Sequence, residues 1–279
     1  MKTVTSISGG QSSAYVAVNY PSDFNVFSLV RLEDKKCQFP DKKMRQLVED
    51  RIQKPFIGTA EDDMIIYTIL DLEQHLGKKI DWVSGITFEE VIRTRGGWLP
   101  NKLHRYCTTA MKIEPMFYWW AEHIGEPVEM QIGYRANETR RAIRMSDKLN
   151  QNGLLEMKAT FEKHPNGRNK WEMIEWQKPV FPMIEDSIYR DHVVEFFRNK
   201  TIRFAKKNNC VHCFHQNPML LKLRSMDHPN KMKWAARQEG GKNGFWRSDL
   251  SYKTIMQHNP QGVIDYDEFS DCDSGFCGI

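Results

Sequence analysis

The chain has little cysteine, little excess charge and no long apolar run. Of its 279 residues six are cysteines, and 40 basic residues face 36 acidic ones, which leaves a formal net charge of +4. So few cysteines do not make a disulfide scaffold, and clustered cysteines in a reducing compartment indicate metal or redox chemistry instead. The small net charge does not require a nucleic-acid partner.

Two kinds of targeting segment are also missing. No apolar run approaches the roughly 20 residues of a membrane span. Residues 1–10 show neither the apolar stretch nor the small-residue cleavage site of a signal peptide. We therefore expect a cytoplasmic protein with no membrane partner. Hydrophobic residues make up 40% of the chain and charged residues 27%, which is typical of a globular protein.

Strand-like and helix-like segments alternate through the first half of the chain. Strands are expected at 2–8, 24–30, 78–85 and 127–134, and helices at 12–20, 40–54, 60–77, 87–97 and 108–125. This alternation predicts an α/β fold, Rossmann-like and doubly wound, with a mostly parallel five-stranded sheet. We assign residues 1–145 to this nucleotide-binding domain.

The composition becomes polar after residue 145. Residues 146–179 carry the turn signal "HPNG" and are expected to form a hairpin or an irregular insertion. Helical patterns return at 186–207, and the chain closes in a helical, cysteine-bearing extension. Residues 146–279 are therefore assigned to an insertion plus extension packed on the first domain.

A glycine-rich loop follows the first expected strand. It matches neither GxGxxG nor GxxxxGK[ST], so a dinucleotide site and a Walker nucleotidase are disfavoured. Glycines let the backbone approach an anion, and the helix that follows presents free N–H groups. The loop is predicted to cradle a phosphate or pyrophosphate, the alternative being a plain strand-to-helix turn. Its residues are Ser8, Gly9, Gly10, Gln11, Ser12 and Ser13.

Basic side chains follow two other segments of the predicted domain. Arg135, Arg140 and Arg141 come after the strand 127–134, so they are expected at the same sheet edge as the loop, with Glu138 orienting one of them. Arg105 and Lys112 flank Cys107. Arginine forks match phosphate or sulfate; the alternative is a solvated, charged helix face. Carboxylates after the second strand (Glu33, Asp34, Asp41) either bind a ribose hydroxyl or Mg²⁺ or form a solvated turn.

Four of the six cysteines lie in two close pairs, Cys210/Cys213 and Cys272/Cys277. Two such pairs can supply four thiolates to zinc or to an iron–sulfur cluster such as [4Fe-4S], and spacing does not separate these metals. His212 and His215 are interleaved and could replace a thiolate. A redox dithiol and unbound thiols are the alternatives. Cys37 has no cysteine nearby in the sequence and is expected to be structural or incidental.

Several segments together resemble one family. "SGGQSS" resembles the SGGxDS pyrophosphate loop of the N-type ATP pyrophosphatases, a superfamily that also contains the PAPS reductases. "RYCTTAMKIEP" (105–115), "IGYRANETRR" (132–141), "VFPMIED" (180–186) and "CVHCF" (210–214) resemble, in this order, segments of PAPS-reductase-like proteins, many of them phage-encoded. The resemblance extends over most of the chain. For a phage-encoded member, the compartment would be the host cytoplasm.

The resemblance implies an enzyme that uses an adenine nucleotide, either PAPS or ATP, with the catalytic roles falling to Cys107, Cys277, Arg105 and Lys112. In one reaction a thiolate attacks the sulfur of PAPS, and a thiol reductant protein completes the cycle. In the other, ATP adenylates a nucleic-acid acceptor and a bound sulfur displaces AMP. A non-catalytic nucleotide-binding protein with structural zinc is the third hypothesis. A homodimer is left open.

The chain departs from the family pattern at two places. Ser12 stands where the ATP pyrophosphatases have the loop aspartate, which argues against adenylation. The tail cysteine of the assimilatory reductases has only a loose counterpart in Cys272 and Cys277, and the Cys210/Cys213 pair argues against a standard reductase of that kind. The sulfonucleotide reaction, or a related sulfur transfer, is therefore the leading expectation.

Overall fold

The computed structural model describes residues 1–207 and 209–258. Its main sheet contains β1 (Thr3–Ile7), β2 (Phe24–Ser28), β5 (Asp81–Val83), β6 (Val128–Gln131), β7 (Leu155–Lys163) and β8 (Asn169–Val180). The strand order is β5-β2-β1-β6-β8-β7, and every neighbouring pair is parallel except β7 with β8. The α/β, mostly parallel prediction is confirmed. The predicted count of five strands is wrong, because the sheet has six.

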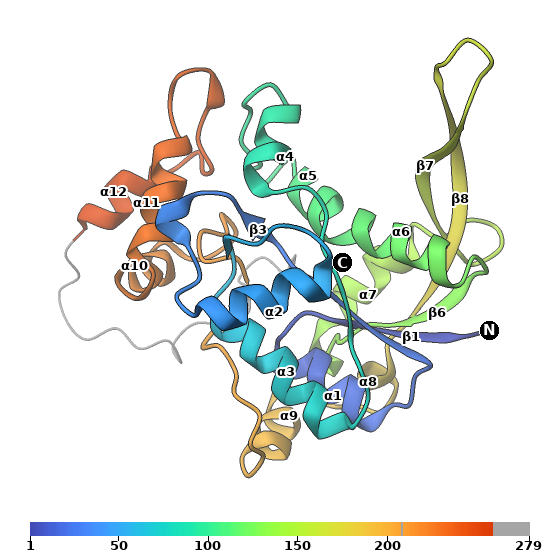
Figure 1. Cartoon of the computed structure of the whole chain (residues 1–279). Helices are drawn as coiled ribbons and strands as arrows, with labels where there is room; N and C mark the ends of the chain where they lie inside the picture. Colours follow the sequence, from blue (N-terminus) through green and yellow to red (C-terminus); the bar gives the residue numbers. More distant parts are fainter. Residues whose placement is uncertain (208, 259–279) are drawn as a thin grey trace.

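Two of the six strands, β7 and β8, come from the polar segment after residue 145. β7 and β8 form the expected hairpin, and the turn falls at the predicted "HPNG", where Gly167 has a φ of 80°. Only the last part of β8 joins the parallel sheet, with Val128 opposite Gln177 and Gln131 opposite Val180. The outer part of the hairpin extends away from the body of the molecule (Figure 1). The sheet therefore continues beyond residue 145.

Local sequence signals explain where the helices of the first half begin and end. Asp41 caps α2 (Lys42–Ile52) by accepting from the N–H groups of Lys43 and Met44. α3 (Met64–Leu76) ends at Gly77, which has a φ of 58°. A capping box between Thr87 and Glu90 opens α4 (Phe88–Thr94). The other helices of this half are α1 (Gln11–Asn19), α5 (Tyr106–Thr108), a π-helical turn (Thr109–Ile113), α6 (Glu114–His123) and α7 (Thr139–Ser146).

Helices cover both faces of the sheet. On one face, residues of α1, α3 and α9 (Arg190–Phe197) form a core with Ile7 and Phe27. On the other face, the aromatic side chains of α6 pack against Met130 and Trp176. Burying an apolar face on each side of a parallel sheet is what stabilises this architecture. A short helix, α8 (Pro182–Glu185), follows β8.

The C-terminal extension shares a third core with the first half of the chain. Its helices are α10 (Pro218–Asp227), α11 (Pro229–Gln238) and α12 (Tyr252–Gln257). Trp234 and Trp246 of the extension contact Phe88 at ring-centroid distances of 5.4 and 5.6 Å. A small antiparallel pair, β3 (Arg31–Leu32) and β4 (Gly58–Thr59), contributes Leu32 to this core. Short 3₁₀ turns occupy Lys35–Cys37, Ala136–Glu138 and Gly241–Asn243.

Within residues 1–207 and 209–258, no helix is both long enough and apolar enough to cross a membrane.

Candidate functional site

The candidate site lies at the point where the strand order of the sheet reverses, between β1 and β6. From β1 the chain proceeds to β2 and β5 on one side, and then crosses to β6 and β8 on the other. In open α/β sheets, ligands bind in the crevice at this reversal, beyond the carboxyl ends of the strands. A cavity of about 930 Å³ occupies this position. The predicted loop residues from Ser8 to Ser13, except Gly9, line one of its walls.

The glycine loop joins β1 to α1, as the sequence predicted. Gly9 has a φ of 77°, and a Cβ there would lie 2.6 Å from Cγ2 of Ile65, so a side chain is excluded twice over. Gly10 is the N-cap of α1 and supplies no side-chain cap. The N–H groups of the first turn of a helix have no intrahelical acceptor and point towards whatever lies beyond it. The first turn of α1 is therefore suited to an anion.

Ser13 holds the loop in this shape. Its hydroxyl accepts a hydrogen bond from the backbone N–H of Ser8 at 3.1 Å and donates to the carbonyl of Gly10 at 3.0 Å. The Oγ atoms of Ser8 and Ser13 are also 3.1 Å apart. The predicted loop residues therefore differ in their roles. Ser13, which is buried, shapes the loop, whereas Gln11 and Ser12 lie on the cavity wall without such a role.

Gly133 brings the end of β6 against the loop. A Cβ on this residue would lie 2.9 Å from the amide nitrogen of Ser13 and 3.0 Å from the carbonyl carbon of Ser12. The sequence analysis did not single out this glycine. Its signal was a glycine at the end of an expected strand, where close backbone approach is one of the usual reasons for it.

The arginines after β6 are organised by Glu138. Its carboxylate accepts from the backbone N–H and the Nε of Arg135, both at 3.0 Å, and pairs with Arg141. The Arg141 guanidinium also lies over the Tyr134 ring, 4.1 Å from its centroid. Burial raises the pKa of Glu138, but the charges of Arg135 and Arg141 outweigh it and hold the pKa below the ordinary value of 4.5. One carboxylate thus serves two arginines, and Arg140 adds a further cation to the same wall.

The segment from Arg105 to Lys112 lines the neighbouring wall. The Lys112 ammonium lies 2.7 Å from Oε1 of Glu61, a residue that is 0% exposed. Oε2 of Glu61 is buried as well and hydrogen-bonds to none of the residues that the structure describes. The sequence analysis did not single out Glu61. This buried carboxylate is what holds the predicted catalytic lysine at the edge of the cavity.

Cys107 lies on the same wall, and its thiol is neutral. Burial raises its pKa above the ordinary value of 9.0, and the nearby Arg105 offsets this only in part. A cysteine attacks as its thiolate. The structure therefore places Cys107 at the cavity but does not activate it.

The Cys210/Cys213 pair forms a tight turn ahead of α10. The N–H of Cys213 donates to the carbonyl of Cys210 at 3.0 Å, and the N–H of Val211 donates to the carbonyl of Ala60, just after β4. Both cysteines line the cavity, together with Cys107. The structure therefore gathers three of the candidate cysteines at one cavity. Cys37 is buried away from it, and burial raises its pKa to about 11.

The two interleaved histidines are neutral. His212 is buried among Phe88, Trp234 and Trp246, and burial lowers its pKa to about 3. Burial and nearby cations such as Arg105 lower the pKa of His215 to about 4. Neutral imidazole is the form that binds a metal, so these values do not oppose ligation. The packing of His212 is that of a core aromatic ring.

Only two of the four predicted metal ligands, Cys210 and Cys213, lie among the residues that the structure describes. Cys272 and Cys277 lie outside them, so their part in catalysis or metal binding stays a prediction. Between residues 1 and 258, position 208 aside, no group of three or more Cys, His, Asp or Glu side chains is arranged to hold a metal ion. Cys210 and Cys213 share one turn, as a CxxC ligand pair does, and would supply two of the thiolates.

The carboxylates after the second strand have structural roles. Asp41 caps α2, and Asp34 caps the 3₁₀ turn at Lys35–Cys37 and pairs with Arg237. Glu33 accepts from the Thr87 hydroxyl at 2.7 Å. The cavity lining does not include these three residues, so the alternative of a ribose or Mg²⁺ site at this place has no support.

The segment between α9 and the CxxC turn forms a further wall of the cavity. This segment was not among the site residues predicted from the sequence. Lys206, Lys207 and Asn209 line the cavity there, and Arg190 lies at the start of α9. The available signal was the lysine pair shortly before Cys210. Basic residues on the described lining outnumber the acidic ones, Glu138 and Asp191; the basic residues are Arg105, Lys112, Arg135, Arg140, Arg141, Arg190, Lys206 and Lys207.

Comparison with protein-family models, with curated proteins and with solved structures finds no match to this chain. The resemblance described above therefore rests on the motifs alone.

Proposed function

We propose that the protein is an adenine-nucleotide-binding enzyme of the PAPS-reductase-like type, which carries out sulfonucleotide reduction or a related sulfur transfer. One observation supports this above all. A single cavity at the reversal point of the sheet is lined by the glycine loop, by the arginines after β6 and by three cysteines. An anion-binding loop, a cationic wall and thiols are the parts that this chemistry needs.

Different residues of the cavity would bind the phosphate end of the nucleotide and neutralise its charge. The first turn of α1 would accept the phosphate end of the nucleotide, as helix N-termini do. Arg135 and Arg141, pre-oriented by Glu138, would neutralise charge that develops on the leaving phosphate. Lys112, held by Glu61, and Arg105 would do so from the neighbouring wall.

The proposed reaction proceeds in two displacements. A cysteine thiolate attacks the sulfur of the sulfonucleotide, the S–O bond to the phosphate breaks, and the nucleotide leaves with the bonding electrons. A thiolate of a dithiol reductant protein then attacks the Sγ atom of the sulfonated cysteine. The Sγ–SO₃ bond breaks, sulfite leaves, and a mixed disulfide between the two proteins remains. The second thiol of the reductant reduces that disulfide, so the reductant supplies both electrons. Of the two predicted nucleophiles, Cys107 has a raised pKa, which favours Cys277 as the attacking thiolate. In that role Cys277 would not also be a metal ligand.

The alternative, ATP-dependent adenylation, has less support from the same cavity. Mg²⁺ bound to ATP phosphates is usually held by one or two protein carboxylates. Of the two acidic residues on the described lining, Glu138 is engaged by arginines. Ser12 replaces the loop aspartate. The cationic lining is better suited to a nucleotide that binds without magnesium.

The test compares ligand-induced stabilisation of anaerobically purified protein. A ligand that binds only the native state at a hundredfold excess over its Kd stabilises by about 2.7 kcal/mol. We expect a rise in Tm with PAPS and with adenosine 3′,5′-bisphosphate, and release of sulfite from PAPS when a dithiol protein is added. Arg135→Gln should abolish the shift. The matched variant Arg168→Gln, on the exposed hairpin tip, should retain it.

Two results would count against the proposal. A shift with Mg²⁺-ATP and none with PAPS would favour adenylation and direct attention to a nucleic-acid acceptor. No shift with any nucleotide would overturn the assignment of Ser8–Ser13 as a phosphate cradle.

A further inference from the structure

One wall of the cavity has no regular secondary structure. Residues 201–207 contain neither helix nor strand, yet Phe204, Lys206 and Lys207 line the cavity, followed by Asn209 and Cys210. A segment without a helical or strand ladder keeps its position only through other hydrogen bonds and packing. The groups that hold its carbonyls therefore decide where two lysines and a cysteine lie.

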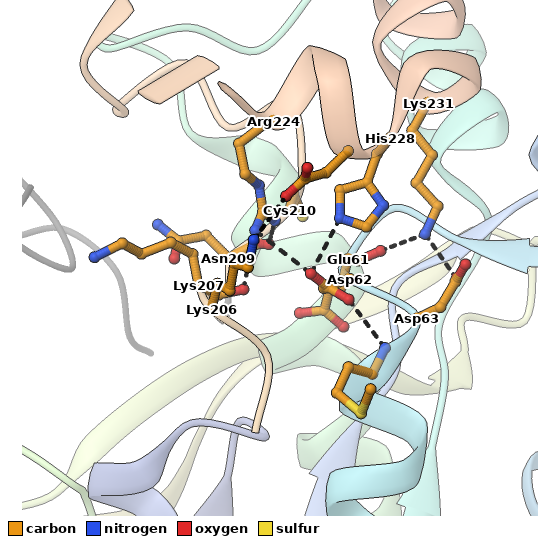
Figure 2. A network of polar contacts seen from close by, with 12 residues as sticks. Glu61, Asp62, Asp63, Lys206, Lys207, Asn209, Cys210, Arg224, His228 and Lys231 are labelled. Carbon is orange, nitrogen blue, oxygen red and sulfur yellow. Dashed lines mark hydrogen bonds and ion pairs between the residues drawn. The ribbon is translucent and has the colours of Figure 1, made fainter. Parts of the chain in front are cut away.

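Arg224 of α10 holds this wall from behind. Its side chain is fully buried, and its Nη1 and Nη2 donate to the carbonyls of Lys207 and Asn209 at 3.2 and 3.0 Å (Figure 2). Arginine can do this because its guanidinium presents several donors in a rigid plane. Arg224 itself is not part of the cavity lining. It contacts the wall from outside the cavity.

Arg224 is in turn held by the loop after β4. Its Nη1 lies 3.7 Å from Oδ2 of Asp62, and the same oxygen lies 3.1 Å from Nε2 of His228. Oδ1 of Asp62 accepts from the N–H of Met64 at the start of α3. Figure 2 shows these groups converging on Asp62. A continuous set of contacts thus runs from α3 through Asp62 and Arg224 to the cavity wall.

A second contact set lies next to this one. The Lys231 ammonium of α11 donates to the carbonyl of Glu61 and pairs with Oδ1 of Asp63 at 2.7 Å. Glu61 is the residue that holds Lys112 at the cavity. Three consecutive acidic residues therefore join the C-terminal helices to two walls of the same cavity.

We propose that Arg224 is a positioning residue for the nucleotide site: by clamping the carbonyls of Lys207 and Asn209 it sets the wall that carries Lys206, Lys207 and Cys210. This rests on the proposed nucleotide-binding function. The C-terminal helices are then part of the binding apparatus, because they carry the clamp. They are not merely an appendage of the nucleotide-binding sheet.

The test uses Arg224→Lys in the full chain. Lysine keeps the positive charge for Asp62 but cannot donate to both carbonyls in a planar fork. We expect the Kd for PAPS, measured by calorimetry, to rise about tenfold, as the loss of a charged hydrogen bond predicts. We also expect trypsin to cleave the native protein faster after Lys206 and Lys207, as read by mass spectrometry.

The matched control is Arg51→Lys. Arg51 also makes a two-pronged contact, to Glu73 at 2.9 and 2.8 Å, and neither residue lines the cavity. This variant should lose stability without changing the Kd or the cleavage rate after Lys206 and Lys207. A merely structural role for Arg224 would make the two variants alike. That result, or a wild-type Kd together with wild-type cleavage in Arg224→Lys, would overturn the proposal.

A second variant keeps the proposal testable if Arg224→Lys does not fold. Asp62→Asn retains an oxygen that can accept from Met64 but removes the charge that holds Arg224. Asp62→Asn should raise the Kd for PAPS and the rate of trypsin cleavage after Lys206 and Lys207, each by less than Arg224→Lys does. Wild-type values of both would contradict the clamp. If the wild-type protein binds no nucleotide, the proposed function fails. The cleavage assay would still report whether Arg224 holds the wall.

Discussion

The backbone of Gly133 lies so close to Ser13 that a Cβ on the glycine would be 2.9 Å from the serine amide nitrogen. The segment just after β6 and the glycine loop thus meet without an intervening side chain, and both line the candidate site. The atoms in the way belong to backbone, so they cannot rotate aside as a flexible side chain would.

Gly133→Ala should therefore displace the loop. We expect a loss of about 1–3 kcal/mol in unfolding free energy, as for other overpacked sites, and loss of the nucleotide-induced rise in Tm. Urea denaturation and calorimetry with PAPS would measure the two effects. The control is Gly167→Ala on the hairpin tip, where φ is 80° and no atom lies within 4 Å. It should cost about 1 kcal/mol through backbone strain and leave binding intact. Unchanged binding in Gly133→Ala would contradict the close-contact argument.

The Lys112–Glu61 pair should be strongly coupled. Lys112→Met leaves a fully buried carboxylate without its ammonium, and removing one partner of a buried pair costs about 3–5 kcal/mol. Glu61→Gln in the same chain should recover much of that loss, because no charge then remains to be buried. A double-mutant cycle by urea denaturation measures the coupling. Additive effects of the two substitutions would show that the pair is not coupled.

Cys107 should alkylate slowly at neutral pH. Because burial raises its pKa above 9.0, the thiolate fraction in the native protein keeps increasing beyond that pH. Iodoacetamide labelling followed by peptide mass spectrometry would give the rate at each pH. Urea-unfolded protein supplies the reference with an ordinary thiol, and Cys37, with a pKa of about 11, supplies a buried one. A labelling rate that levels off below pH 8 would show an activated thiolate instead.

Asp62 should make stability depend on pH in the acid range. Burial raises its pKa, but hydrogen bonds from His228 and the Met64 N–H, with the charges of His228 and Arg224, lower it from 3.8 to about 2. The folded state therefore favours the ionised carboxylate. Its contribution is fully present above pH 3.8 and is lost as the pH falls towards 2.

The size of this effect follows from the pKa difference and amounts to about 2 kcal/mol. Urea denaturation of the wild type and of Asp62→Asn between pH 6 and pH 2.5 would measure it. The difference between the two proteins should shrink as the pH falls. The exposed control Asp147→Asn should show no such trend, and a constant difference for Asp62→Asn would contradict the assignment.

The metal prediction is tested by comparing both cysteine pairs. If four thiolates hold one ion or cluster, Cys213→Ser and Cys272→Ser should each lower the metal content of anaerobically purified protein, measured by mass spectrometry and iron absorbance. Because such a site ties the tail to the CxxC turn, Tm should fall in both variants. Metal content that depends on Cys213 and not on Cys272 or Cys277 would exclude the four-cysteine arrangement.

Local features of this protein were predictable from sequence because short-range geometry determines them. A left-handed residue after β1 needs a glycine, and Gly9 supplies it. Asp41 and Gly77 mark helix ends through their own caps. The alternation of strands and helices predicted a parallel sheet, since parallel neighbours need a crossover between them. The loop and the arginines met at one edge for the same reason.

The tertiary structure decided three features: the joining of the hairpin to the parallel sheet, the Gly133 contact and the lysine wall. β8 is polar along its outer part and joins the parallel sheet only at its end. Glu61 and Lys112, or Asp62 and Arg224, are far apart in sequence and are paired only by the packing of separate elements. No local pattern records such pairs, because their stabilisation comes from burial in the folded chain. The sequence by itself thus determined the glycine loop between β1 and α1, whereas the folded structure determined which cations and thiols line the same cavity.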